Sequence, residues 1–194
     1  MADEDCMASL QQAGREAEKT MLSVTGGINT HKGAIYAFGL ILAAMGAHIS
    51  FGSELFSTAA MLAFDGELPQ EETHGAQVRK KFRNCGARAE ATEGFPNAFS
   101  AYNVLKETNN PYRALLWLMA SVTDTNLLYR GGADGLIYVQ ELAKKTQNAS
   151  DEALETALMQ MDQSCIQHHL SPGGSADLLA LAFFLHKTES IWDD

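Results

Sequence analysis

Four short segments of the sequence combine glycines with side chains that bind phosphate, bind metal ions or transfer protons. They span residues 25–33, 74–96, 124–132 and 170–177, and the core of the second is 86–96. Paired glycines let the backbone turn tightly, and the backbone N–H groups at the start of a helix favour an anion. Lysine and arginine add a full positive charge, while carboxylates bind magnesium or stabilise a developing cation. Each segment is therefore a candidate site for a phosphate-bearing ligand.

The first segment joins Gly26 and Gly27 to Thr30, His31 and Lys32. Thr30 is expected to be the N-cap of an apolar helix, so that His31 and Lys32 lie at its positive end. The alternative is an ordinary glycine stop followed by a capped helix. The spacing alone favours that alternative, because it is not that of the phosphate-binding loop of P-loop proteins.

In the second segment a phosphate-binding cation, Arg88, lies close in sequence to the carboxylate of Glu90. The alternative is a solvated, salt-bridged loop, which has the same composition.

In the third segment, Asp124 ends an apolar helix one turn before Arg130-Gly131-Gly132, where it could bind magnesium and phosphate. Its alternative is a helix-terminal aspartate bonded to its own turn. In the fourth, Gly173 and Gly174 lead into a helix whose first turn holds Ser175 and Asp177, a capping arrangement first and an anion or metal site second.

The elements that must position these segments are helices. Apolar residues recur at helical spacing, no stretch alternates as a strand does, and no linker or repeat divides the chain. We expect an all-α fold, a single-domain multi-helix bundle over residues 1–194. The predicted helices span 10–24, 30–45, 53–64, 73–84, 97–106, 110–124, 135–146, 151–168 and 175–186, with 86–96 irregular.

Composition limits the class of partner. The formal net charge is −10, with 24 acidic against 14 basic residues, which disfavours nucleic acid but allows a nucleotide. The three cysteines, Cys6, Cys85 and Cys165, have no metal-site spacing and indicate a reducing cytoplasm. The two most apolar windows, 34–45 and 178–185, are shorter than the roughly 18 residues of a membrane span, so no membrane is expected.

Taken in order, the four segments resemble the signature blocks of the triphosphoribosyl-dephospho-coenzyme A synthase family. That family serves prosthetic-group biosynthesis for citrate lyase and malonate decarboxylase. The matching blocks are Gly-Gly-Ile-Asn-Thr-His-Lys-Gly at 26–33, Gly-Ala-Arg-Ala-Glu at 86–90, Gly-Phe-Pro at 94–96, Asp-Thr-Asn with Arg-Gly-Gly at 124–132 and Leu-Ser-Pro-Gly-Gly-Ser-Ala-Asp-Leu-Leu-Ala at 170–180. The resemblance implies an all-helical transferase that joins the triphosphoribosyl group of ATP to dephospho-coenzyme A and releases adenine.

The resemblance also implies roles for residues. The catalytic candidates are His31, Glu90 and Asp124, with His31 as acid or base because imidazole exchanges a proton near neutral pH. The candidates for magnesium are Glu90, Asp124 and Asp177. The residues expected to bind the substrate ATP are Gly26, Gly27, Asn29, Thr30, Lys32, Arg88, Arg130, Gly132, Gly173, Gly174 and Ser175.

Members of that family usually begin with a further segment that bears a Pro-Lys-Pro-Gly element. This sequence resembles the C-terminal two thirds, so a separate N-terminal segment is one expected partner. A second copy of the chain, in a homo-oligomer, is the alternative partner. The rival hypothesis is a non-catalytic nucleotide-binding remnant. A helical metal-dependent phosphohydrolase is disfavoured, because the sequence lacks a closely spaced His-Asp pair. Adenine release distinguishes the transferase from the remnant and from the phosphohydrolase, which would form ADP and phosphate.

Overall fold

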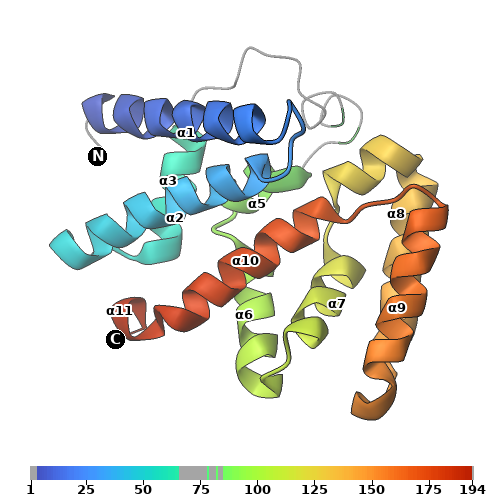
Figure 1. Cartoon of the computed structure of the whole chain (residues 1–194). Helices are drawn as coiled ribbons and strands as arrows, with labels where there is room; N and C mark the ends of the chain where they lie inside the picture. The colour runs from blue at the N-terminus through green and yellow to red at the C-terminus, as the bar shows by residue number, and fades with distance from the viewer. Residues whose placement is uncertain (1–3, 66–77, 79–81, 83–84, 194) are drawn as a thin grey trace. The chain divides into compact units, whose positions relative to one another are not determined.

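The computed structural model describes residues 4–65, 78, 82 and 85–193 (Figure 1). Every regular element in these residues is a helix, so the predicted all-α class is confirmed. The predicted helix at 73–84 lies outside the described residues, apart from Val78 and Phe82. The helices are α1 (Glu4–Val24), α2 (Lys32–Phe51), α3 (Leu55–Asp65), α5 (Gly86–Thr92), α6 (Pro96–Thr108), α7 (Pro111–Ser121), α8 (Thr125–Gln147), α9 (Asp151–Gln167), α10 (Gly173–Lys187) and α11 (Glu189–Trp192).

The chain divides into two compact units. Unit 1 consists of Met1–Gln70, Ala87–Pro96 and Lys187–Asp194, and unit 2 consists of Glu71–Gly86 and Asn97–His186. Three of the four predicted segments have residues in unit 2, while the first lies wholly in unit 1.

In unit 1, α2 packs against α1, α3 and α11. Its buried residues are all apolar; they are Ala37, Leu40, Ile41, Ala44 and Met45. On the side of α11, Phe56 and Trp192 meet edge to face with ring centroids 5.6 Å apart. α2 ends at Gly52, whose φ of 65° is left-handed and whose N–H donates to the carbonyl of His48.

α2 is longer than the sequence indicated. It has 20 residues instead of ending near Met45, and it alone among the described helices is long and apolar enough to cross a membrane. Only 28% of its most apolar window is buried. The length and composition of a single helix are weak evidence that it spans a membrane, because the core helix of a soluble protein passes the same test.

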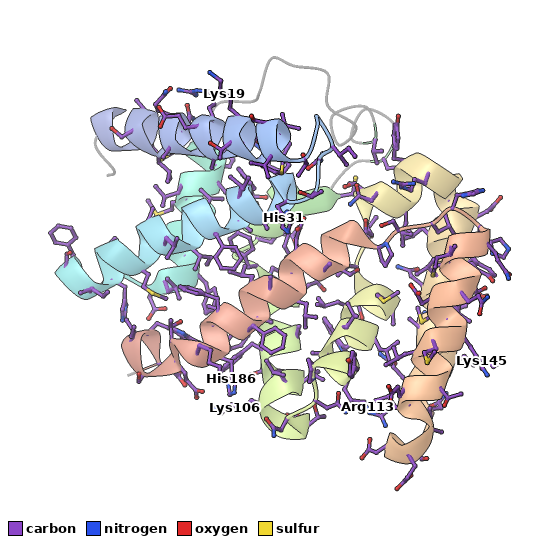
Figure 2. All side chains as sticks on the ribbon, viewed as in Figure 1. Lys19, His31, Lys106, Arg113, Lys145 and His186 are labelled. Atoms are coloured by element: carbon purple, nitrogen blue, oxygen red, sulfur yellow. The ribbon has the colours of Figure 1, made fainter. Side chains whose placement is uncertain are left out.

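In unit 2, α8 packs against α7 on one side and α9 on the other. Their shared core contains the buried residues Leu116, Met119, Leu127, Val139, Ala143, Leu154, Met161, Cys165 and Leu170. Replacing one such leucine by alanine typically costs about 2–5 kcal/mol. The Arg113 guanidinium of α7 donates to the carbonyls of Gln147 and Ala149 and pairs with Asp151, which ties α7 to the α8–α9 connection (Figure 2).

Two local predictions were wrong. Residues 86–92, expected to be irregular, form α5. The helix expected at 110–124 ends at Ser121, and a new helix, α8, begins at Thr125 with Asp124 as its N-cap. The predicted break near residue 132 is a kink within α8, where Gly132 adopts φ 64° and ψ −159°.

Candidate functional site: a junction of two helix starts

Asp124 begins α8. Its backbone is extended, with φ −71° and ψ 118°, and its Oδ1 accepts hydrogen bonds from the N–H groups of Asn126 at 2.8 Å and Leu127 at 3.4 Å. These N–H groups have no partner inside the helix, because the first turn lacks preceding carbonyls. Asp124 is therefore the side-chain cap of α8 and does not end the preceding helix.

The second oxygen of the same carboxylate reaches another helix. Asp124 Oδ2 accepts from the N–H of Ser175 at 2.9 Å and from its hydroxyl at 3.4 Å. Ser175 lies in the first turn of α10 and is fully buried, as Asp124 is with 1% of its surface exposed. One carboxylate thus joins the starts of two helices whose residues are 51 positions apart.

Three glycines make room for this junction. A Cβ on Gly174 would stand 3.1–3.2 Å from the carboxylate atoms of Asp124, and one on Gly173 would stand 2.5 Å from the side-chain nitrogen of Asn126. A Cβ on Gly86, which has φ 80°, would meet Thr125 Cγ2 at 2.7 Å. The glycines of two predicted segments therefore close around the Asp-Thr-Asn of a third, within unit 2.

The surroundings of Asp124 act on its charge in two ways. Burial raises the pKa of the Asp124 carboxyl above its usual value, because the ionised form loses its hydration. The hydrogen bonds from Ser175, Asn126 and Leu127 oppose that shift. The positive ends of α8 and α10 also favour a negative charge at this point.

The glycines that follow Arg130 determine how α8 packs and where it kinks. The side chain of Leu170 lies where a Cβ on Gly131 would stand, at 2.6 Å, and close to Gly135 as well. Gly132 supplies a conformation that residues with a Cβ avoid. Arg130 itself is exposed at this kink. Asp177 lies one turn into α10 and is half-buried.

Unit 1 holds the first predicted segment, where one helix ends and another begins. Gly26 and Gly27 have φ of 66° and 85°, and the Gly27 N–H donates to the carbonyl of Leu22 at 2.7 Å, which is a Schellman stop for α1. The prediction that Thr30 is the N-cap of α2 was wrong. His31 occupies that position, and the acceptor for the Lys32 N–H is the side chain of Asn29 at 3.0 Å.

His31 is exposed at the start of α2, and one ring nitrogen lies 2.7 Å from the hydroxyl of Thr30 (Figure 2). The ammonium of Lys32 forms an ion pair with Glu18 of α1 at 2.7 Å. Sequence reasoning missed Glu18, because nothing in an amphipathic helix marks which carboxylate faces a residue 14 positions later.

Arg88 and Glu90 lie on α5 in unit 1, where Glu90 is buried with 8% of its surface exposed. The predicted convergence of Glu90 with Asp124 and Asp177 spans the two units and stays a prediction. Among the described residues, no group of three or more His, Cys, Asp or Glu side chains could hold a metal ion.

Taken together, these features define an all-α protein with a buried carboxylate at a glycine-lined junction of helix starts. The profile of the CitG family, described as ATP:dephospho-CoA triphosphoribosyl transferase, matches residues 1–194. The chain belongs to this family and is a transferase.

Relatives match nearly the whole chain. A 2-(5''-triphosphoribosyl)-3'-dephosphocoenzyme-A synthase of Haemophilus ducreyi is 36% identical over 221 residues, covering 95% of this chain and 68% of that protein. Protein CitXG of Haemophilus influenzae is 34% identical over 213 residues, covering 95% of this chain and 46% of that protein. Because the match runs through all four segments, the remnant hypothesis is not favoured.

A crystal structure provisionally described as a triphosphoribosyl-dephospho-coA synthase from Archaeoglobus fulgidus shares the fold. It superposes with a TM-score of 0.64 over 94% of this chain and 96% of that one. At 14% identity this likeness concerns the fold alone.

Proposed function

We propose that the chain transfers the triphosphoribosyl group of ATP to a ribose hydroxyl of dephospho-CoA and releases adenine. The observation that carries the proposal is the match of residues 1–194 to the CitG family. In this reaction the bond from the anomeric carbon to the incoming oxygen forms, and the bond from that carbon to adenine breaks. The hydroxyl proton is lost and adenine leaves as the neutral base.

The triphosphate survives into the product, so its binding groups position it and neutralise its charge without transferring a phosphoryl group. Within unit 2 we assign this task to the start of α10 and to Arg130. The N–H groups of Gly173 and Gly174 donate to no backbone carbonyl in the hydrogen bonds of the described residues, and the end of a helix where they lie attracts anions. The Ser175 N–H is already engaged by Asp124, so Ser175 acts through that contact.

In unit 1, Lys32 and Arg88 are proposed to contribute positive charge to phosphate binding, and Gly26, Gly27, Asn29 and Thr30 to shape the turn that presents Lys32. The departing base needs a proton and the incoming hydroxyl must lose one. His31 is the proposed acid or base, and its exposure leaves the ring accessible to a ligand. Glu90 is the proposed carboxylate for the ribosyl cation, because such a transition state gains from a nearby negative charge.

Magnesium is proposed to arrive with ATP as part of the substrate. Mg²⁺ of this kind keeps several waters and binds phosphates plus one or two carboxylates, so a preformed protein cage is not required. Asp177 and Glu90 are the proposed carboxylates, and Asp124 is left out because its two oxygens already accept four hydrogen bonds.

We place the product in prosthetic-group biosynthesis for citrate lyase or malonate decarboxylase, on the signature blocks that the chain shares with enzymes of those pathways. A cytoplasmic location is proposed on the cysteines: Cys85 and Cys165 are buried and neither is in a disulfide.

The test of the reaction is the identity of its products. With ATP, dephospho-CoA and magnesium, chromatography should reveal adenine and triphosphoribosyl-dephospho-CoA in equal amounts. Omitting dephospho-CoA should suppress adenine, which separates a transferase from a nucleosidase. If ADP and phosphate accumulate in place of adenine, the chain is a phosphohydrolase and the proposal fails.

The test of the site uses two exposed cations of α8. Arg130→Ala should weaken ATP binding about ten- to a hundredfold in calorimetry, as the loss of a charge-assisted phosphate contact of about 1.5–3 kcal/mol implies. Lys145→Ala, which removes a positive charge from the last turn of α8 (Figure 2), should change it less than about threefold. If both variants weaken ATP binding equally, Arg130 affects binding only through the net charge and does not contact the phosphates.

A further inference from the structure

We propose that Asp124 is a positioning residue, which holds the starts of α8 and α10 together so that the α10 turn presents its N–H groups to the triphosphate. It would then touch neither magnesium nor the ribosyl cation. This inference rests on the proposed function, and it gives Asp124 a different role from the one its motif suggests.

The first argument is the occupancy of the carboxylate. An ionised carboxylate offers about four acceptor positions on its two oxygens. All four are taken: Oδ1 by two N–H groups of α8, and Oδ2 by the N–H and hydroxyl of Ser175. With 1% of its surface exposed, Asp124 could bind a metal ion only after giving up donors that have no other acceptor.

The second argument is that the two oxygens serve different helices. If Asp124 only capped α8, a single oxygen would be enough, as for Asn110, whose Oδ1 accepts from the N–H of Tyr112 at the start of α7. The bond to Ser175 adds a constraint on α10 that a cap does not need. Ser175 directly follows Gly173 and Gly174, whose N–H groups are the proposed phosphate donors, so the carboxylate fixes their direction.

The third argument comes from Gly174. Its missing Cβ would stand 3.1 Å from the carboxyl carbon of Asp124, closer than nine in ten real Cβ contacts. Gly174→Ala should therefore displace the carboxylate while leaving its charge and every other residue in place. This offers a second way to disturb the same contact, and it does not alter the chemistry of Asp124.

The experiment compares three single variants and one double variant in the adenine-release assay, well below their melting temperatures. Asp124→Asn keeps an oxygen for α8 but turns an amide NH₂ toward the Ser175 N–H, so it breaks the link to α10. We expect the KM for ATP to rise about tenfold or more, with kcat within about threefold of the unmodified chain. Gly174→Ala should act in the same direction.

The double variant Asp124→Asn/Gly174→Ala tests whether both changes act through one contact. Its effect on KM should be clearly smaller than the product of the single effects, because a contact can be lost only once. Asn110→Ala is the matched control: it removes the cap of one helix, and it should lower the melting temperature without changing either kinetic constant.

Two results would overturn the inference. If Asp124→Asn lowers kcat a hundredfold or more at unchanged KM, while Gly174→Ala behaves as the unmodified chain, then Asp124 acts on the reacting atoms. If Asp124→Asn changes only the melting temperature, as Asn110→Ala should, the carboxylate is a cap and no more.

A failure of the proposed function would look different, since the unmodified chain would then make no adenine. ATP binding by calorimetry would still test the positioning role in that case, with weaker binding in both Asp124→Asn and Gly174→Ala as the expected result. If Asp124→Asn does not fold, Gly174→Ala alone carries the test, and unchanged ATP binding in that variant contradicts the inference.

Discussion

The ammonium of Lys32 is held by the carboxylate of Glu18, and the two side chains keep 31% and 28% of their surfaces exposed. An ion pair this accessible to water contributes little to stability, typically about 0–1 kcal/mol. A triphosphate carries several negative charges, so it could displace Glu18 from Lys32. The pair is therefore a competitor for the phosphate role that Lys32 is proposed to have.

Removing that competitor should strengthen ATP binding. In Glu18→Gln, Lys32 loses its partner, and we expect the Kd for ATP in calorimetry to fall about two- to fivefold, which corresponds to roughly 0.4–1 kcal/mol. Glu16→Gln is the matched control, because Glu16 lies on the same helix and its carboxylate accepts from Gln12. It makes the same change in net charge, so any gain common to both variants is a general electrostatic effect.

The gain must also depend on Lys32. In a Lys32→Ala background, Glu18→Gln should change the Kd no more than Glu16→Gln does in that background. A Glu18→Gln variant that binds ATP no better than Glu16→Gln would show that the ammonium stays with α1 and takes no part in the site.

Single residues of the candidate site were within reach of sequence reasoning, but their contacts were not. Asp124, Gly174 and Ser175 could be named from residue type and position near helix ends. That Asp124 bonds to Ser175 depends on how α8 and α10 pack, and helical periodicity carries no information about a contact 51 residues away. For the same reason, the sequence could not show that the oxygens of Asp124, proposed as magnesium ligands, instead accept hydrogen bonds from the starts of two helices.

Among the elements, α8 is the one whose shape depends on a single residue. Gly132 interrupts it with φ 64° and ψ −159°, a region that residues with a Cβ adopt only under strain. A Cβ at this position would meet no atom within 4 Å, so the cost of a substitution is conformational and not steric. The kink separates the capped turn at Asp124 from the long segment that packs on α9.

Gly132→Ala should therefore destabilise the fold by about 1–3 kcal/mol, measured as a lower urea midpoint at unchanged slope. Gly46→Ala provides a control of the opposite sign. Gly46 lies inside α2 with no atom within 4 Å of its would-be Cβ, so alanine should stabilise the helix by about 0.5–1 kcal/mol. If Gly132→Ala matched this gain, α8 would run without a required kink.

Helix boundaries were predictable where a cap had its usual residues. Asn110 followed by Pro111 caps α7 as the pair indicated. The α7–α8 connection was missed because Val122, Thr123 and Asp124 join the two helices without a glycine or proline, and Val122 continues the apolar pattern of α7. α5 was missed because glycine and proline at 86–96 indicate turns, although here Gly86 only precedes the helix and Pro96 opens the next one.

At the scale of the whole molecule, the contacts group into two units, yet the chain crosses between them at four places: after residues 70, 86, 96 and 186. α5 begins at Gly86 in unit 2 and continues in unit 1, and α6 begins at Pro96 in unit 1 and continues in unit 2. Each unit therefore contains the first residue of one helix whose remaining residues belong to the other unit. The single domain that the sequence predicts stays a prediction, and it requires the two units to unfold cooperatively.

The two tryptophans make that cooperativity measurable, because Trp117 lies on α7 in unit 2 and Trp192 on α11 in unit 1. Trp192→Phe leaves fluorescence to report on unit 2, and Trp117→Phe leaves it to report on unit 1, while far-UV circular dichroism follows the helices of both. Within each variant, the fluorescence and dichroism midpoints in urea should agree to about 0.2 M, as two-state unfolding requires. Comparing probes inside one variant removes any effect of the substitution on stability. If fluorescence precedes dichroism in one variant and follows it in the other, the units unfold separately, and the chain consists of two domains.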